Sequence, residues 1–376
     1  MIVLISKRLP PTRCGIGDYT RGLAMALAAR GEIVAGLAWE NPGDPPPADA
    51  VFPIKYLAAE STSALLNILQ EFSQIAKAPV DVILQTSQYD VHPQALAGWL
   101  TRGLAQAQSS GFVRQWVMMM HEIWLPHMAR RREVLRYPWQ RASFARLLNT
   151  AGAVATPTTT YAKRIERLAP NSHPKVLPVF SNFDEPDTTD ALEAPRENST
   201  WTIFGSAIRL RAGLESLLDD AGKNDLRSQI QKLEVFGGER DAGVEAILNR
   251  NPPIPHNYQP AISAEQAGEC LRKCHAAWID YREAHVDAAL LGKSGILAAA
   301  LANGVLPVLA HPATGFAAEG DALPCWYSVS NPPPLADSPA AQSARAKNLE
   351  WYHHRASRKV HAAWYAGALR TAIAKK

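Results

Sequence analysis

The sequence predicts an α/β protein built from two doubly wound, parallel-sheet domains in series. A chain of 376 residues is too long for one ordinary hydrophobic core, which indicates two domains. Short apolar runs alternate with amphipathic helical sequence in both halves, as in parallel sheets covered by helices. A polar, acidic, proline-bearing stretch, residues 183–199, separates the two alternations and is expected to be the interdomain linker.

The first half predicts a Rossmann-like domain over residues 1–185. A helix is expected at 17–30, directly after the first strand. Buried strands are expected at residues 1–6, 33–39, 80–87, 113–121 and 152–157. Since ligands of such sheets bind at the carboxyl ends of the strands, the residues that follow these runs are the first candidates for a site.

The second half predicts a similar domain over residues 199–354, with helices at 212–220 and 263–273. Its expected strands are residues 201–207, 232–238, 276–281 and 305–310. A long helical pattern covers 341–374, and its end, 355–376, is expected to return to the first domain. The two domains are expected to face each other across a cleft.

Composition favours a soluble protein of a reducing compartment. Hydrophobic residues make up 47% and charged residues 20%, and no apolar run reaches the length of a membrane span. The first residues are apolar only briefly and then basic, the reverse of a secretory signal. The four cysteines are scattered, and Cys270 and Cys274 lack a nearby set of metal-binding partners. We therefore expect free thiols, no metal, and a cytoplasmic protein, with the inner face of the membrane as a further possibility.

Charge is distributed unevenly along the chain. Residues 1–183 carry a formal charge of +7 and residues 184–376 a charge of −3, within a total of +4. A basic first half suggests an anionic partner there, with solubility alone as the alternative. One basic helical segment contains Arg130, Arg131, Arg132, Arg136, Arg141 and Arg146, interleaved with Tyr137, Trp139 and Phe144. Such a segment suits an anionic membrane surface or an anionic acceptor, and a solvated helix face is the alternative. No nucleic-acid motif accompanies it, so no nucleic-acid partner is expected.

Two glycines, Gly15 and Gly17, follow the first predicted strand. Glycines there let the backbone turn sharply and approach a ligand. The full dinucleotide fingerprint is incomplete, because Gly22 is misplaced for the third glycine, and a plain strand–helix turn is the alternative. His121 and Glu122 stand at the exit of a later strand, where a histidine is predicted to point into the ligand cleft, with a structural histidine as the alternative.

The second half carries two candidate phosphate-binding elements. Lys293, Ser294 and Gly295 precede a helix of small residues, and a helix N-terminus offers unpaired N–H groups and partial positive charge, although ordinary capping of a core helix is the alternative. Gly205-Ser206 with Arg209 and Arg211 follows another strand of the same sheet, so the two elements can meet on one diphosphate. With no catalytic triad, zinc spacing or P-loop lysine motif, these features favour nucleotide-sugar chemistry over hydride transfer.

Taken together and in this order, four segments resemble the retaining glycosyltransferases of family 4, which have the GT-B fold. The segments are PPTRCGIGDYTRGLAMALAARG, HEIWLP, VFSNF and KSGILAAALANGVLPVLA. The resemblance implies transfer of a sugar from a nucleotide diphosphate sugar to a hydroxyl on a glycan, lipid-linked or small-molecule acceptor. Configuration would be retained, through same-face attack assisted by the leaving phosphate, and neither a metal nor a further cofactor would be needed.

The resemblance also implies residue roles. Gly15 and Gly17 would lie near the donor phosphate and the acceptor, and His121 would contact the transferred sugar. Ser206 with Arg209 or Arg211 would bind the diphosphate, together with Lys293, Ser294 and Gly295 at a helix N-terminus.

The chain departs from the family in two places. Many members carry two glutamates eight positions apart, where this chain has Leu291 and Ala299, and Gly205-Ser206 stands in place of the usual Gly-Arg. Replacement polar contacts to the sugar or nucleotide would have to come from residues such as Glu122, Asp280, Glu283, His285 and Asp287. Two alternatives therefore stay open: a catalytically degenerate GT-B binding subunit, or a nucleotide-sugar epimerase.

Overall fold

The computed structural model divides into two compact units. It describes residues 1–12, 14–43, 52–123, 131–197, 199–223, 226, 229–250, 254–281, 288–310 and 322–371. Unit 1 consists of Met1–Leu177 and the C-terminal segment from Arg358, and unit 2 consists of Pro178–Ser357. Both contain a parallel sheet, as the alternation of the sequence predicts.

The sheet of unit 1 has seven strands in the order β3-β2-β1-β4-β5-β6-β7. The strands are β1 (Ile2–Ser6), β2 (Val34–Ala38), β3 (Ile54–Tyr56), β4 (Val80–Ser87), β5 (Val113–Glu122), β6 (Val154–Thr156) and β7 (Lys175–Val176). Val3 in β1 pairs with Ala35 on one side and Val82 on the other. The chain order reverses direction between β1 and β4, which makes this pair the topological switch point of the sheet.

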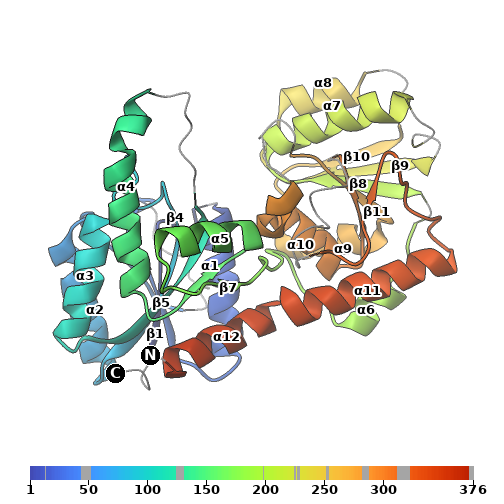
Figure 1. Cartoon of the computed structure of the whole chain (residues 1–376). Coiled ribbons are helices and arrows are strands. Elements are labelled where there is room, and N and C mark those ends of the chain that lie inside the picture. The colour runs from blue at the N-terminus through green and yellow to red at the C-terminus, as the bar shows by residue number, and fades with distance from the viewer. Residues whose placement is uncertain are drawn as a thin grey trace. The chain divides into compact units, whose positions relative to one another are not determined.

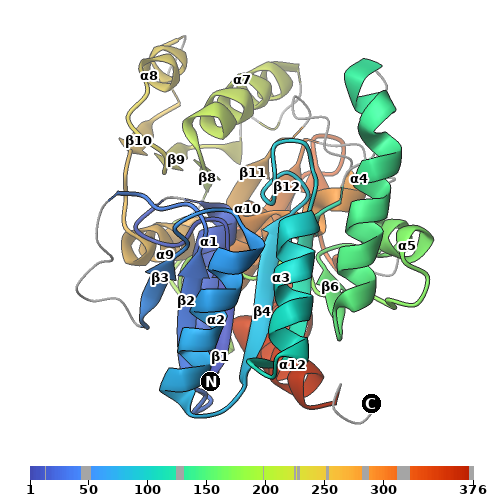
Figure 2. The same cartoon turned by 90° about the vertical axis from the view of Figure 1, so that its left-hand side faces the viewer.

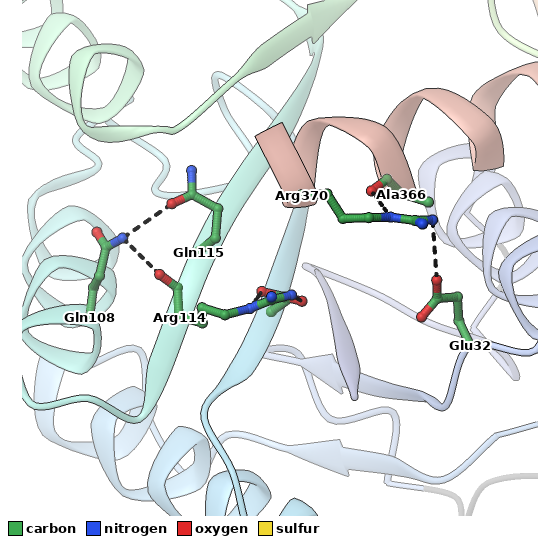
Figure 3. Close-up of polar contacts among 7 residues, drawn as sticks. Glu32, Gln108, Arg114, Gln115, Ala366 and Arg370 are labelled. Carbon is green, nitrogen blue, oxygen red and sulfur yellow. Dashed lines mark hydrogen bonds and ion pairs between the residues drawn. The ribbon is translucent and has the colours of Figure 1, made fainter. Parts of the chain in front are cut away.

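Helices cover both faces of this sheet. They are α1 (Gly15–Ala28), α2 (Thr62–Ala76), α3 (Gly98–Ser109), α4 (Arg131–Thr150), α5 (Thr159–Leu168) and α12 (Arg358–Thr371). Figure 2 shows α2 and α3 in front of the strands and α12 behind them, where α12 packs against α1. Figure 3 shows one α12 contact: Arg370 donates to the Ala366 carbonyl and approaches Glu32 at 3.8 Å, at the surface. On the other face, Gln108 of α3 donates to Arg114 and Gln115 of β5 (Figure 3).

Unit 2 has a six-stranded sheet in the order β10-β9-β8-β11-β12-β13. Its strands are β8 (Thr200–Phe204), β9 (Lys232–Phe236), β10 (His256–Gln259), β11 (Ala276–Ile279), β12 (Leu306–Leu309) and β13 (Tyr327–Ser328). Helices α7 (Ala207–Lys223) and α8 (Ala242–Leu248) cover one face, while α9 (Ala264–Lys273) and α10 (Gly295–Ala302) cover the other (Figure 1). Each face buries its own apolar core. Order reverses between β8 and β11, so the loops after these two strands meet at the switch point.

The segment expected to be a linker, residues 183–199, is part of unit 2 and contains the short helix α6 (Thr188–Glu193). Its anchor is Arg196, whose guanidinium donates to the backbone carbonyls of Leu271, Cys274, Ala191 and Asn303. Burial lowers the pKa of Arg196 to about 10, so the side chain stays charged at neutral pH. One polar residue of this stretch, Arg196, thus ties it to the backbone of unit 2.

The long C-terminal helical pattern forms two helices instead of one. Helix α11 (Pro339–Arg355) belongs to unit 2, whereas α12 belongs to unit 1, and the chain leaves helical geometry at Ala356 and Ser357. Three side chains of α12 are buried against the rest of unit 1: His361, Tyr365 and Leu369. Among the described residues, no helix combines the length and apolar character needed to cross a membrane.

Candidate functional site

The switch point of unit 2 brings two backbones into close approach. Gly205, directly after β8, has a φ of 138°, which L side chains rarely adopt, and a Cβ there would lie 3.0 Å from Ile296. A Cβ on Gly237, directly after β9, would lie 2.8 Å from the Gly205 carbonyl oxygen. The glycines are therefore required for the packing of these loops, and they leave the backbone at the strand ends free of side chains.

Three polar side chains form a chain of contacts at this switch point. The Arg209 guanidinium lies 4.4 Å from the ring centroid of Tyr281, which follows β11. The Tyr281 hydroxyl is 2.9 Å from Ser294 Oγ, and Ser294 accepts a hydrogen bond from the Leu297 N–H as the N-cap of α10. An arginine over an aromatic ring, a partly buried phenol and a helix cap thus form one continuous arrangement.

Lys293 contributes a second positive charge to the same place. Burial raises the pKa of Tyr281, and the charges of Arg209 and Lys293 act against that rise, as does the Ser294 hydrogen bond. Both cations therefore lie close enough to the phenol to influence its ionisation. Tyr281 is the residue that sequence reasoning missed, although an aromatic side chain directly after a buried strand at a switch point is a signal that points to it.

The N-terminus of α10 is bordered by the Ser181-Asn182 segment. A Cβ on Gly295, the first residue of α10, would lie 3.7 Å from Asn182 Nδ2. Ser181 is fixed from two sides, since its N–H donates to the Tyr352 hydroxyl at 2.8 Å and its Oγ accepts from the Phe183 N–H at 3.1 Å. The amide side chain of Asn182 is thus held beside Gly295, the first residue of α10, which has no Cβ.

Arg211 lies in a different environment from Arg209. It approaches Asp241 at 3.6 Å, and Asp241 also caps α8 by accepting from the Val244 N–H. Of the two arginines predicted to bind a diphosphate, Arg209 is therefore the one that the structure brings together with Lys293, Ser294 and Gly295. Ser206 is exposed at the start of α7.

The positions of the expected glutamates are filled by core residues. Leu291 and Ala299 are each 1% exposed, and Ala299 packs in the same cluster as Phe204 and Phe236. Asp280 is also buried, at 8% exposure. Glu283, His285 and Asp287 lie outside the described residues.

In unit 1 the two glycines of the first loop have unequal surroundings. A Cβ on Gly17 would lie 2.8 Å from the Arg8 carbonyl oxygen, whereas Gly15 has open space where a Cβ would be. Cys14 stands at the N-cap of α1 without a side-chain capping bond. The glycine at 17 lets the start of α1 approach the loop after β1, and the glycine at 15 leaves the helix start uncovered.

His121 lies within β5 and is only 6% exposed. Its Nε2 is 2.9 Å from Gln85 Oε1, and its ring meets the edge of Tyr19 at a centroid distance of 4.8 Å. Burial, with a smaller effect of His361, lowers the pKa of His121 to about 3, so the ring is neutral at physiological pH. Sequence alone does not predict this enclosure, which arises because α1 and α12 meet over the strand. The adjacent Glu122 is exposed.

The cluster around His121 joins helices distant in sequence. Gln85 Nε2 donates to the Tyr365 hydroxyl at 3.3 Å, and the Tyr19 hydroxyl is 2.5 Å from His361 Nδ1. These contacts unite five buried residues in one polar cluster: Tyr19, Gln85, His121, His361 and Tyr365.

The basic segment is partly described. Arg130 lies outside the described residues, and Arg131 and Arg132 begin α4, where their side chains are not described. Beyond them, Arg136, Arg141 and Arg146 are exposed. Leu135 and Trp139 are 72% and 67% exposed and lie four residues apart, hence on one stripe of the helix.

Within the described part of the chain, no group of three His, Cys, Asp or Glu side chains is arranged to hold a metal ion. No protein-family model matches the sequence, and comparison with curated proteins gives no significant match. Solved structures do match over nearly the full length of the chain, at low sequence identity.

Three structural matches illustrate this likeness. A glycosyltransferase from Rickettsia africae has a TM-score of 0.62 at 10% identity, covering 99% of this chain and 98% of its own. An α,α-trehalose 6-phosphate synthase from Burkholderia multivorans has a TM-score of 0.57 at 12% identity, covering 100% and 99%. A candidate UDP-N-acetylglucosamine 2-epimerase from Listeria monocytogenes has a TM-score of 0.52 at 11% identity, covering 100% and 97%. These matches and the two Rossmann-like units establish that the chain has the GT-B fold.

Proposed function

We propose that the protein is a glycosyltransferase that moves a sugar from a nucleotide diphosphate sugar to a hydroxyl acceptor with retention of configuration. One observation carries the proposal: Arg209, Lys293 and the Ser294-capped start of α10 meet at the switch point of unit 2. Cations and free N–H groups at a helix start suit a diphosphate. The structural neighbours include proteins described as glycosyltransferases, and this supports the same class of reaction.

The proposed mechanism stabilises the leaving diphosphate. When the bond between the sugar and the diphosphate breaks, negative charge grows on the phosphate oxygens. Arg209 and Lys293 would offset that charge, together with the N–H groups of the first turn of α10, which Gly295 leaves accessible. Fixed cations in these positions would do the work that a metal ion does in other enzymes. His121, with its neutral ring, would position the sugar and would not act as a base.

The test uses purified full-length protein with a panel of nucleotide sugars and candidate acceptors, with a chelator present. Free nucleotide is measured, together with the anomeric configuration of the product. We expect turnover with one donor and a loss of at least tenfold in Lys293→Ala. The control is Arg240→Ala, which removes a cation of the same unit that is 78% exposed and paired with Glu245. Absence of binding and turnover with every donor would refute the proposal.

A binding subunit without catalysis is the second candidate, and the burial of Leu291 and Ala299 favours it. Both side chains belong to the apolar core, so neither position can present a carboxylate to a ribose or a sugar. This candidate predicts nucleotide or glycan binding without turnover, and turnover that disappears in Lys293→Ala would contradict it. The epimerase alternative predicts an epimerised free donor without transfer.

For the acceptor side, we propose that the protein contacts an anionic membrane surface peripherally. Its acceptor would be a glycan or a lipid-linked molecule that the protein reaches from the cytoplasmic side. Leu135 and Trp139 form an exposed apolar stripe on α4, flanked by Arg136. Vesicle binding should rise with anionic lipid, fall with salt, and weaken in Trp139→Ala. Ile75→Ala, which removes an apolar side chain 59% exposed on α2, is the control. Equal binding to neutral vesicles would contradict this part of the proposal.

A further inference from the structure

A second polar site lies within unit 1, between α4 and α5. A cavity of about 240 Å³ is bounded there by Arg141 from α4 and by Arg164 and Arg167 from α5. Gln88 and Ile123, which directly follow β4 and β5, place it at the carboxyl ends of two strands, where parallel sheets bind ligands. None of the described residues that line the cavity is acidic, so the three guanidinium groups share it without an internal counter-charge.

The three arginines differ in how they are held. Arg164 is fixed, since its Nη1 donates to the Ile123 carbonyl at 3.3 Å and its guanidinium lies 5.5 Å from the Tyr161 ring centroid. Arg141 and Arg167 are exposed, and among the described residues no carboxylate forms an ion pair with either of them. One anchored guanidinium group, that of Arg164, and two without an ion pair, those of Arg141 and Arg167, are well suited to surround a tetrahedral anion.

A buried amide adds a second, independent observation. Gln140 lines the same cavity at 2% exposure, and its Nε2 donates to the Gln94 carbonyl. Its Oε1 accepts no hydrogen bond within the part of the chain that the structure describes. A buried acceptor without a donor is costly, and a ligand hydroxyl would satisfy it. A fully ionised phosphate has no proton to donate to Gln140 Oε1. The donor would therefore be a hydroxyl elsewhere on the ligand.

Size and wall chemistry narrow the ligand further. The volume of about 240 Å³ has room for many water molecules, which is more than an isolated phosphate needs. Phe144 and Ile123 supply an apolar wall, and Tyr137 supplies an aromatic one. Such walls suit the C–H face of a sugar ring, while the arginines suit its charged substituent.

We propose that this cavity binds a phosphate-bearing, hydroxylated molecule of the sugar-phosphate type, with the phosphate among Arg141, Arg164 and Arg167 and a hydroxyl donating to Gln140 Oε1. The phosphate has two chemically equivalent sources, a free sugar phosphate or the headgroup of a phosphorylated glycolipid or inositol lipid. Binding at this cavity requires no nucleotide sugar, so it is separable from the sugar transfer proposed above.

Calorimetric titration of the full chain tests the proposal with four probes: inorganic phosphate, glucose 6-phosphate, glucose, and vesicles containing phosphatidylinositol phosphate. We expect glucose 6-phosphate or the phosphoinositide vesicles to bind, and glucose to show no binding at the same concentration. Arg141→Ala and Arg167→Ala should each weaken binding about tenfold or more, because each removes a charge-assisted hydrogen bond. Binding should strengthen as pH rises through about 6, where a phosphate monoester gains its second charge.

The matched control is Arg146→Ala, which removes the same charge from an exposed position of α4 outside the cavity. It should change affinity less than twofold. Gln140→Leu should reduce the preference for glucose 6-phosphate over inorganic phosphate while leaving phosphate binding in place. Vesicle binding without glucose 6-phosphate binding would assign the cavity to a lipid headgroup.

Two results would overturn the proposal. An equal loss in Arg146→Ala and Arg141→Ala would show only general attraction to a basic surface. No binding of any phosphate probe would show that the cavity is not a phosphate site. Neither result bears on the nucleotide-release assay, since its diagnostic variant, Lys293→Ala, lies in unit 2 and no residue of this cavity takes part in the proposed transfer.

Discussion

The guanidinium of Arg209 lies over the ring of Tyr281, 4.4 Å from its centroid. The two residues follow different strands, β8 and β11, that are neighbours at the switch point of unit 2. The contact fixes the direction of the arginine, and the Tyr281 hydroxyl fixes the phenol against Ser294. A flexible cation is thereby held at a helix start before any ligand arrives, which lowers the entropic cost of binding.

Removing the ring should therefore weaken diphosphate binding without removing a charge. We expect Tyr281→Ala to lose about tenfold in affinity for a nucleoside diphosphate, because Arg209 loses its stacking partner. Tyr281→Phe keeps the ring and should stay within about threefold of the parent. Calorimetry with a panel of nucleoside diphosphates measures both. Equal losses in the two variants would mean that the hydroxyl, and not the stacking, positions Arg209.

Ser294 should separate stability from ligand binding. Its Oγ caps α10, so Ser294→Ala should lower the free energy of unfolding by about 1 kcal/mol. Ser294→Asp retains the cap but places a negative charge where the diphosphate is proposed to bind. The aspartate variant should therefore keep most of its stability in urea and still bind nucleoside diphosphates more weakly than the alanine variant. If it binds them as well as the parent, the diphosphate does not lie at this helix start.

The first glycine loop offers a matched pair. Gly17→Ala places a Cβ 2.8 Å from a backbone oxygen that cannot move independently, so we expect a loss of about 1–3 kcal/mol in stability. Gly15→Ala meets open space in the first turn of α1 and should be neutral or slightly stabilising. Thermal and urea unfolding of the two variants measure the difference. Equal destabilisation by both would contradict the close approach of α1 to the Arg8 backbone.

Buried His121 predicts acid sensitivity of unit 1. Its pKa is lowered to about 3 in the folded protein, whereas an unfolded histidine titrates near 6.5. Between these values the unfolded state binds a proton that the folded state does not. The free energy of unfolding therefore carries no penalty from His121 above about pH 6.5 and falls as the pH decreases towards 3. The slope due to one such histidine is about 1.4 kcal/mol per pH unit. Denaturant unfolding between pH 7 and 4 should show a weaker dependence in His121→Gln.

Parent and variant with identical slopes would show that His121 does not contribute. His275 of unit 2 is the internal comparison, since burial and Arg345 lower its pKa to about 4. Its titration should persist in His121→Gln. Unfolding followed by probes placed separately in the two units distinguishes the contributions.

The fold was predictable from the sequence because its buried strands are continuous apolar runs that end at glycines or polar residues. Strands β1, β4 and β5 follow the predicted runs closely. Strands β3, β7, β10 and β13 were not predicted, since each has only two to four residues and no fully buried pattern. The N-terminus of α7 was predicted too late, because Ala207–Arg211 carries little apolar periodicity next to the strand end.

The candidate site was only partly predictable. The sequence brings Lys293, Ser294 and Gly295 together because they are adjacent, and it places Arg209 after a strand of the same sheet. It does not reveal that Tyr281 connects them, or that Arg211 turns to Asp241, because those contacts depend on the order of β8 and β11. The enclosure of His121 was also hidden, since two of the buried side chains around it come from α12, more than 200 residues later in the sequence.

Unit 1 is not assembled from one continuous stretch of chain. Its sheet and helices α1–α5 lie before residue 178, yet His361 and Tyr365, which contact Tyr19 and Gln85, lie in α12, after the whole of unit 2. During synthesis these contacts form only once unit 2 has been made, so the first part of unit 1 waits without its last helix, a state that favours chaperone binding. Removal of α12 should therefore uncover part of the buried surface of unit 1, whereas unit 2 keeps all of its strands.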